Sequence, residues 1–218
     1  AVAVENTHLG SGGRIMPVET AAAIAGVARE RGLGVHLDGA RLWHAAAETG
    51  LPPEAWARHA DTVMVALSKG LGCPVGSVLA GPERLMAEAW RVRRRYGGAM
   101  RQSGILAAAG LYALEHHRDD LVRDHARARR LAEALDAVPG LHAAPPETNI
   151  VLVEVDEEGP DRGALLSFLR NHRILMLEFG TSGLRAVTHR DVDDPGIARA
   201  VSALEAWRGS CGAEGGLA

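Results

Sequence analysis

The stretch TVMVALSKG, residues 62–70, decides the fold class of this chain. Residues 62–67 form a near-continuous apolar run, which is typical of a strand buried on both faces of a parallel sheet. A second strand is predicted at residues 34–38, and helices are predicted on either side of it. Strands that alternate with helices predict a mainly parallel sheet with helices outside it, and therefore an α/β protein.

The pattern extends along most of the chain. Further strands are predicted at residues 1–4, 75–80, 149–155, 174–177 and 184–188. Further helices are predicted at residues 17–31, 82–96, 161–171 and 195–208. Residues 99–138 are predicted to be almost entirely helical, with a break near His117.

We expect two domains and a tail. Residues 1–117 are predicted to form part of a large domain, and residues 118–208 a smaller α+β domain. Residues 209–218 are Gly-rich and are predicted to be a disordered tail. The chain opens on an apolar run at residues 1–4, and a domain seldom begins inside its own buried sheet. We therefore interpret the chain as the carboxyl portion of a longer protein, without the N-terminal part of the large domain.

Composition argues against several classes of protein. The 218 residues are 47% apolar and 23% charged, unlike a disordered chain, a collagen or a coiled coil. The net charge of −3 gives no reason to expect nucleic acid or an anionic membrane as a partner. No apolar stretch is long enough to span a bilayer. The two cysteines, Cys73 and Cys211, have no metal-like spacing and fit a reducing compartment, so we expect a cytoplasmic protein.

The basic residues single out one position. Of 24 basic residues, Lys69 is the one lysine and all others are arginines. A surface cation tolerates exchange of lysine for arginine, but a position that needs a neutral amine does not, because a guanidinium is never deprotonated in a protein. The composition therefore marks Lys69 as a candidate functional amine, with chance survival as the alternative.

Lys69 and Asp38 are expected at the same edge of the sheet. Each follows or ends a predicted strand, and ligands of open parallel sheets bind outside the carboxyl ends of the strands. A carboxylate and an amine at neighbouring strand ends suit pyridoxal phosphate: the amine binds the cofactor and the carboxylate keeps its pyridine nitrogen protonated. A salt bridge at the sheet end explains the same pair equally well.

The local sequences carry a resemblance to a known family. VHLDGAR at residues 35–41 and LSKGLGCPVGS at residues 67–77 resemble the low-specificity L-threonine aldolases. These belong to the β-eliminating lyase group of the fold-type I pyridoxal-phosphate enzymes. The resemblance also includes ENTH at 5–8, GGAMRQ at 97–102 and RAVTH at 185–189, in the same order along the chain. Leu9 departs from the pattern, because the family usually has asparagine there.

The resemblance implies a set of cofactor residues. Lys69 is the residue that binds pyridoxal phosphate covalently, and Asp38 is the partner of the pyridine nitrogen. Ala40 is expected against one face of the ring. Arg101 resembles the residue that is lent to the cofactor phosphate of a neighbouring subunit.

It also implies substrate residues. Arg41 and Arg185 resemble the pair that binds the substrate carboxylate, for which a planar guanidinium is well suited. From its short strand alone, Arg185 would be interpreted as a surface arginine. His8 lies near the site in the family, but a hydrogen-bonded histidine at a strand end is an equal alternative.

The function that the resemblance implies is a retro-aldol cleavage, in threonine catabolism and glycine biosynthesis. L-threonine, L-allo-threonine and related β-hydroxy-α-amino acids would be split to glycine and an aldehyde. The large domain would be of the aspartate aminotransferase type, in a homo-oligomer, a dimer or a tetramer, with sites shared between subunits. The alternatives are another fold-type I enzyme, a β-eliminating lyase or a transaminase, and a non-catalytic fragment.

The sequence offers three other sites, each of which is disfavoured. His36, Asp38 and His44 could be drawn as a metal site, but they lack a recognisable spacing and leave Lys69 unexplained. The basic run at residues 91–96 could contact nucleic acid, although a basic helix end or a subunit contact is commoner. The loop at residues 10–13 is weak evidence for a phosphate site. We expect no metal, no nucleic acid and no membrane.

Overall fold

The computed structural model describes residues 1–214, with side chains described through residue 209. The chain forms two compact units. The first unit comprises Ala1–His8 and Arg14–Leu121, and the second comprises Leu9–Gly13 and the described residues from Val122 onward.

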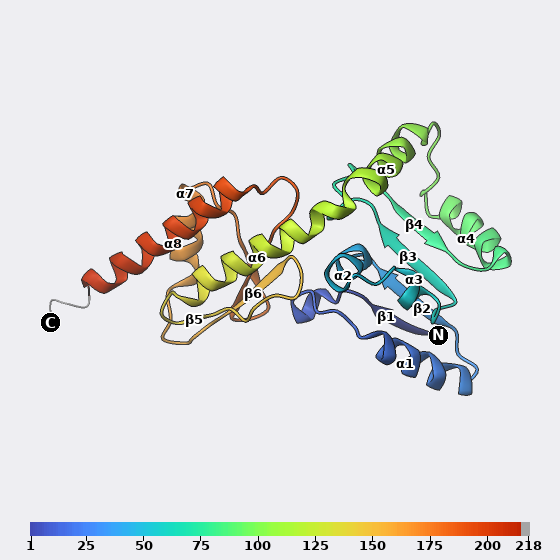
Figure 1. Cartoon of the computed structure of the whole chain (residues 1–218), viewed down its shortest axis with the longest axis horizontal. Helices are drawn as coiled ribbons and strands as arrows, with labels where there is room; N and C mark the ends of the chain where they lie inside the picture. The colour runs from blue at the N-terminus through green and yellow to red at the C-terminus, as the bar shows by residue number, and fades with distance from the viewer. Residues whose placement is uncertain (215–218) are drawn as a thin grey trace. The chain divides into compact units, whose positions relative to one another are not determined.

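The first unit is built on a four-stranded sheet in the order β1-β2-β3-β4 (Figure 1). Its strands are β1 (Val2–Glu5), β2 (Val35–Gly39), β3 (Thr62–Ala66) and β4 (Ser77–Ala80). Strands β1, β2 and β3 pair in parallel, and β4 pairs with β3 in the antiparallel sense. The predicted α/β class with a mainly parallel sheet is confirmed.

Along the chain, three helices lie between these strands: α1 (Val18–Glu30), α2 (Leu42–Thr49) and α3 (Glu54–Ala57). Helices α4 (Glu83–Arg95) and α5 (Gly104–His116) follow β4. The 3-10 turn η2 (Arg118–Asp120) also belongs to the first unit, whereas η1 (Leu9–Ser11) belongs to the second. Pro17 is the N-cap residue of α1 and has an extended backbone, as N-cap residues usually do. A core cluster joins Leu37 of β2 to α1, α2 and α3, and includes the buried Trp56, whose indole N–H donates to the Met16 carbonyl at 2.6 Å.

The predicted burial of β3 on both faces is wrong. Residues 62–65 are half-buried, and all four residues of β4 are exposed. The physical reason is the alternation of side chains along a strand. Val63 and Val65 pack against the core cluster, whereas Met64 points to the other face and belongs to no core cluster among the described residues.

The second unit is an antiparallel sheet with helices. The sheet order is β5-β6-β8-β7, from β5 (Leu141–His142), β6 (Ile150–Val155), β8 (Gly183–Val187) and β7 (Leu177–Phe179). The helices are α6 (Leu121–Asp136), α7 (Arg162–Asn171) and α8 (Asp194–Glu214). Buried leucines, alanines and valines of these elements form its core.

Two boundaries concern the sequence predictions. Helix α5 ends at His116 and α6 begins at Leu121, so the predicted break near His117 is confirmed. The predicted tail at residues 209–218 overlaps α8, which extends to Glu214, and residues 215–218 lie outside the described residues. The predicted division into residues 1–117 and 118–208 stays a prediction.

Candidate active site

Asp38 occupies the carboxyl end of β2, where the chain turns into α2. Its Oδ1 accepts a hydrogen bond from the Ala40 backbone N–H at 3.0 Å, which fixes the carboxylate of this half-buried residue. Ala40 itself is buried, and Arg41 is the residue that caps the start of α2. The predicted cofactor residues Asp38 and Ala40 therefore lie together with Arg41 in one short segment.

Lys69 lies three residues beyond the end of β3, in a turn held by the backbone. The Leu67 N–H donates to the Gly76 carbonyl at 2.9 Å, and the Gly72 N–H donates to the Lys69 carbonyl at 2.8 Å. Gly70 permits close packing of the turn: a Cβ there would overlap the His44 ring and lie 2.8 Å from Leu121 Cδ2. The turn therefore fixes the backbone position from which the Lys69 side chain extends.

Cys73 anchors the other side of this turn. Its buried Sγ–H lies 3.6 Å from the Ala109 carbonyl of α5, and burial raises the pKa of the thiol. The thiol is thus a packing group and not a competing nucleophile.

Three nearby charges affect the pKa of the Lys69 amine. Its pKa is lowered, first because surrounding protein displaces water from it and second because of the Arg41 guanidinium; Asp38 and Glu5 oppose the shift. Lys69 is an exposed residue, so the surrounding protein displaces water from its amine only in part. No direct ion pair joins Lys69 to Asp38 in the part of the chain that the structure describes, which disfavours the salt-bridge alternative.

Glu5 is a residue of this cluster that sequence reasoning missed. It ends β1 and is the register partner of Asp38 on the parallel strand β2, so both side chains leave the sheet on the same face. Its Oε2 lies 3.9 Å from His8 Nε2. His8 is exposed, and its N–H bonds to the Arg14 carbonyl at 3.1 Å. The signal that could have found Glu5 is its place at the end of a parallel strand.

Two buried polar side chains follow Glu5. Asn6 and Thr7 are both fully buried, and the Asn6 backbone N–H bonds to the Asp38 carbonyl at 2.9 Å. Asn6 Nδ2 and Thr7 Oγ1 have no hydrogen-bond partner among the described residues. Because buried donors are nearly always paired in folded proteins, these two groups favour a polar ligand at this edge of the sheet.

Arg185 belongs to the second unit and lies on β8. Leu184 and Ala186 on either side of it are buried in the core of that unit, so Arg185 occupies the opposite face of the strand. Its Nε is buried and has no hydrogen-bond partner within the described chain. An arginine with a buried and unpaired donor differs from the surface arginine that its sequence context indicates.

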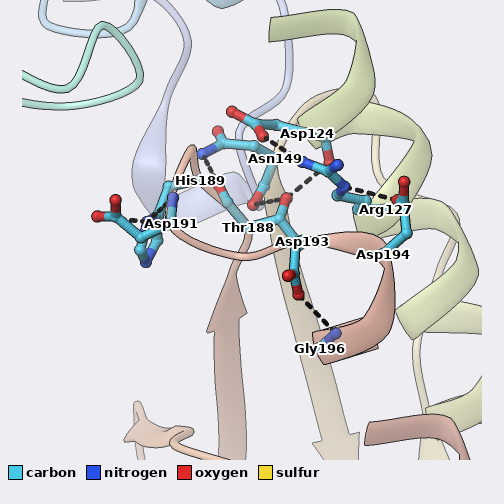
Figure 2. A network of polar contacts seen from close by, with 9 residues as sticks. All are labelled: Asp124, Arg127, Asn149, Thr188, His189, Asp191, Asp193, Asp194 and Gly196. Atoms are coloured by element: carbon cyan, nitrogen blue, oxygen red, sulfur yellow. Dashed lines mark hydrogen bonds and ion pairs between the residues drawn. The ribbon is translucent and has the colours of Figure 1, made fainter. Parts of the chain in front are cut away.

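A polar network holds the end of β8 (Figure 2). Thr188 follows the strand, and its buried Oγ1 donates to the Asp124 carbonyl of α6 at 2.7 Å. Asn149, next to the start of β6, donates from Nδ2 to the Thr188 carbonyl at 2.8 Å. Arg127 of α6 donates to Asp194 of α8 at 2.8 Å. The network ties β6, β8 and two helices together three residues beyond Arg185.

Arg101 is not brought together with the other candidates. It lies exposed in the turn between α4 and α5 and has no partner among the residues described. Its role toward a neighbouring subunit stays a prediction. The roles of the other site residues, including the pairing of Arg41 with Arg185, stay predictions as well.

The disfavoured alternatives gain no support. Among the described residues, no group of three His, Cys, Asp or Glu side chains could hold a metal, and His36 Nδ1 lies 2.8 Å from Thr62 Oγ1 instead.

In the basic run of α4, Arg91 pairs with Glu88 at 2.6 Å and Arg93 lies over the Trp90 ring. The loop at residues 10–13 packs against Ile150 and Leu152 of β6, and Thr148, which precedes that strand, donates to the Gly13 carbonyl at 2.8 Å. The helices of the described chain are all too short or too polar to cross a membrane.

Residues 1–158 match the family model of the beta-eliminating lyases. The chain is 39% identical to low-specificity L-threonine aldolase 1 of Arabidopsis thaliana over 195 residues. This matched segment covers 88% of this chain and 54% of that protein. The chain thus spans about half the length of this curated relative.

Solved structures show the same fold. A putative L-allo-threonine aldolase of Listeria monocytogenes has a TM-score of 0.79 at 24% identity, covering 94% of this chain and 61% of its own. The histidinol-phosphate aminotransferase of Clostridium acetobutylicum has a TM-score of 0.69 at 15% identity, covering 96% of this chain and 64% of its own. The predicted architecture, shared by threonine aldolases and aminotransferases, is confirmed.

Proposed function

The chain belongs to the beta-eliminating lyase family, and from this membership we propose that the protein is a pyridoxal-phosphate-dependent threonine aldolase. It would cleave L-threonine, L-allo-threonine and related β-hydroxy-α-amino acids to glycine and an aldehyde. One observation carries the proposal: the single lysine of the chain lies at the carboxyl edge of the parallel sheet, within reach of the charges of Asp38 and Arg41.

The residues of the first unit fit the cofactor. The lowered pKa of Lys69 favours the neutral amine that must attack the cofactor aldehyde. Asp38, fixed by the Ala40 N–H, would hold a proton at the pyridine nitrogen. The buried Asn6 amide and Thr7 hydroxyl supply unpaired donors for an acceptor-rich ligand. When bound, the cofactor accepts the electron pair that bond cleavage leaves on the substrate Cα.

The remaining groups act on the substrate. Arg41 and Arg185 would hold its carboxylate and thereby orient the Cα–Cβ bond for cleavage. The Cα–Cβ bond then breaks, the β-hydroxyl proton leaves to a base, and a proton returns to Cα. No oxidant or reductant is needed, because the aldehyde and glycine together hold the atoms and electrons of the substrate.

The proposal includes a homo-oligomer, in the cytoplasm, with Arg101 serving the cofactor phosphate of a neighbouring subunit. The support is the surface around Arg101. Tyr96, Met100 and Ile105 are large apolar residues that are at least 60% exposed. An exposed apolar segment of this kind is typical of a subunit contact.

Two variants test the cofactor role. Addition of pyridoxal phosphate and reduction with borohydride should label Lys69, as peptide mapping would show. The variant Lys69→Arg should lose the label and the visible absorption of bound cofactor. The double variant Lys69→Arg/Arg91→Lys restores one lysine on the exposed α4 and should remain unlabelled. A label in that double variant would show that any lysine suffices and would refute the role.

The reaction is tested with substrate. Threonine should yield acetaldehyde and glycine in equal amounts without an added keto acid. Product formation that requires a keto acid would identify a transaminase instead, and ammonia with a keto acid product would identify an eliminating lyase.

A further inference from the structure

We propose that Phe179 is a positioning residue for Arg185, because its ring supports the guanidinium and leaves the guanidinium edge for a carboxylate ligand. The Arg185 guanidinium carbon lies 5.4 Å from the centre of the Phe179 ring. This inference rests on the proposed binding of a substrate carboxylate by Arg185.

Strand register explains why the two residues meet. In the antiparallel pair β7–β8, Phe179 is opposite Gly183, and Arg185 is opposite Leu177. Phe179 and Arg185 are therefore diagonal neighbours on the same face of the sheet, at a spacing that an aromatic and a long side chain can bridge. The face is the one opposite the core residues Leu184 and Ala186.

Gly183 keeps this diagonal contact open. It places no side chain opposite Phe179, and a Cβ at that position would lie 2.9 Å from both the Phe179 and the Val153 carbonyl oxygens. Nothing on β8 therefore stands between the ring and the guanidinium along the strand. The half-buried Phe179 can lean toward Arg185 without a competing side chain.

In this contact, the face and the edge of the Arg185 guanidinium have different roles. A ring attracts a cation through its face, whereas the N–H donors of arginine lie in the guanidinium plane. Contact with the face of the Phe179 ring thus limits the motion of the Arg185 guanidinium without consuming a donor. The buried and unpaired Nε–H remains available. A planar carboxylate that approaches in the guanidinium plane would accept from Nε–H and a terminal N–H together.

The test measures glycine binding to the holoprotein by calorimetry, because glycine carries the carboxylate without undergoing aldol cleavage. The variant Phe179→Leu keeps the apolar bulk and loses the ring face, so Kd for glycine should rise about 2- to 30-fold, the range expected for one cation–π contact. The variant Phe179→Tyr keeps the ring and should bind as the wild type does.

Two comparisons separate positioning from a general structural role. Glycinamide lacks the carboxylate, so its weaker binding should be unchanged in Phe179→Leu. In the Arg185→Gln background, Phe179→Leu should have no additional effect on glycine affinity. Equal losses for glycine and glycinamide, or an unchanged Kd for glycine in Phe179→Leu, would overturn the proposal.

The same experiment distinguishes this inference from the proposed reaction. A wild type that binds glycine through Arg185 and leaves threonine intact would refute the aldolase reaction, and the Phe179 comparison would still support the positioning role. A wild type whose glycine affinity is unaffected by Arg185→Gln would instead refute the carboxylate role of Arg185 and the role of Phe179 with it.

Discussion

Glu5 and Asp38 are register partners on the parallel strands β1 and β2, so two carboxylates leave the sheet side by side at its carboxyl edge. Both raise the pKa of Lys69, whereas partial burial and the Arg41 guanidinium lower it, and the net shift is downward. The pKa of the amine at the centre of the proposed reaction therefore results from two influences that raise it and two that lower it. This balance can be measured directly, because the chain has one lysine.

The pKa of Lys69 should be lower than that of an ordinary lysine in the apoprotein. Reductive methylation with ¹³C-formaldehyde would give one lysine signal and one signal from the chain terminus, and titration by NMR would follow each. Arg41→Gln removes a positive neighbour and should raise the Lys69 pKa. Glu5→Gln removes a negative neighbour and should lower it further.

The pH dependence follows from the sign of the shift. A lowered pKa means that the neutral amine forms at a lower pH than in free lysine. Covalent cofactor binding should therefore persist to a lower pH than an amine with the ordinary lysine pKa would allow.

Glu83→Gln on α4 is the matched control for the titration of Lys69, since Glu83 has no part in the Lys69 shift. An Arg41→Gln variant with a lower Lys69 pKa would contradict this account.

The turn that carries Lys69 should not tolerate a methyl group at residue 70. Gly70→Ala would push against the His44 ring and Leu121, and overpacking of this kind costs about 1–3 kcal/mol. Gly26→Ala is the control, because a Cβ at Gly26 of α1 meets nothing within 4 Å and alanine favours a helix by roughly 0.5–1 kcal/mol. Urea denaturation should thus move the two midpoints in opposite directions; equal midpoints would refute the packing argument.

The end of β8 should depend on the Thr188 hydroxyl. Thr188→Val keeps the side-chain shape and removes the buried bond to the Asp124 carbonyl, at a cost of about 1–3 kcal/mol. Thr20→Val on the exposed side of α1 should change stability by about 0.5 kcal/mol or less. A Thr188→Val variant as stable as Thr20→Val in urea would show that the network in Figure 2 does not hold the strand.

The sequence was sufficient to predict that Lys69 and Asp38 share one edge of the sheet. Both follow from local patterns, an apolar run and a strand that ends in Asp-Gly, and from the rule that ligands bind at strand carboxyl ends. Glu5 was missed for a different reason. Its relation to Asp38 is a matter of register between strands that are 33 positions apart, and no local pattern encodes that pairing.

The edge strand β7 shows the same limit. The apolar run at residues 174–177 predicts a strand there, but the strand is Leu177–Phe179. Arg173 has a left-handed backbone, with φ at 62°, where α7 ends, and the Ile174 N–H still bonds back to the Leu169 carbonyl. The start of the run is thus occupied by the helix end. The contact between Phe179 and Arg185 depends on this shift, so it could not be read from the sequence.

Complementation between subunits would test the shared site. If Arg101 serves the cofactor of a neighbouring subunit, Lys69→Ala and Arg101→Ala homo-oligomers should each have little activity. A hybrid dimer would contain one site with Lys69 from one chain and Arg101 from the other, both native. Random mixing makes half of the dimers hybrid, each with one native site of two, so activity should recover to about a quarter of the wild type.

The control for this recovery is a mixture in which both changes fall on the same chain. The double variant Lys69→Ala/Arg101→Ala, mixed with either single variant, leaves no site with both native residues and should recover nothing. The subunits must exchange for the comparison to count, which tagged chains and affinity capture would verify. Exchange without recovery would refute the sharing of Arg101 between subunits, because each hybrid dimer would then hold no complete site. Recovery near a quarter would in turn place Arg101 in a neighbour's site, which its exposed position beside Met100 permits.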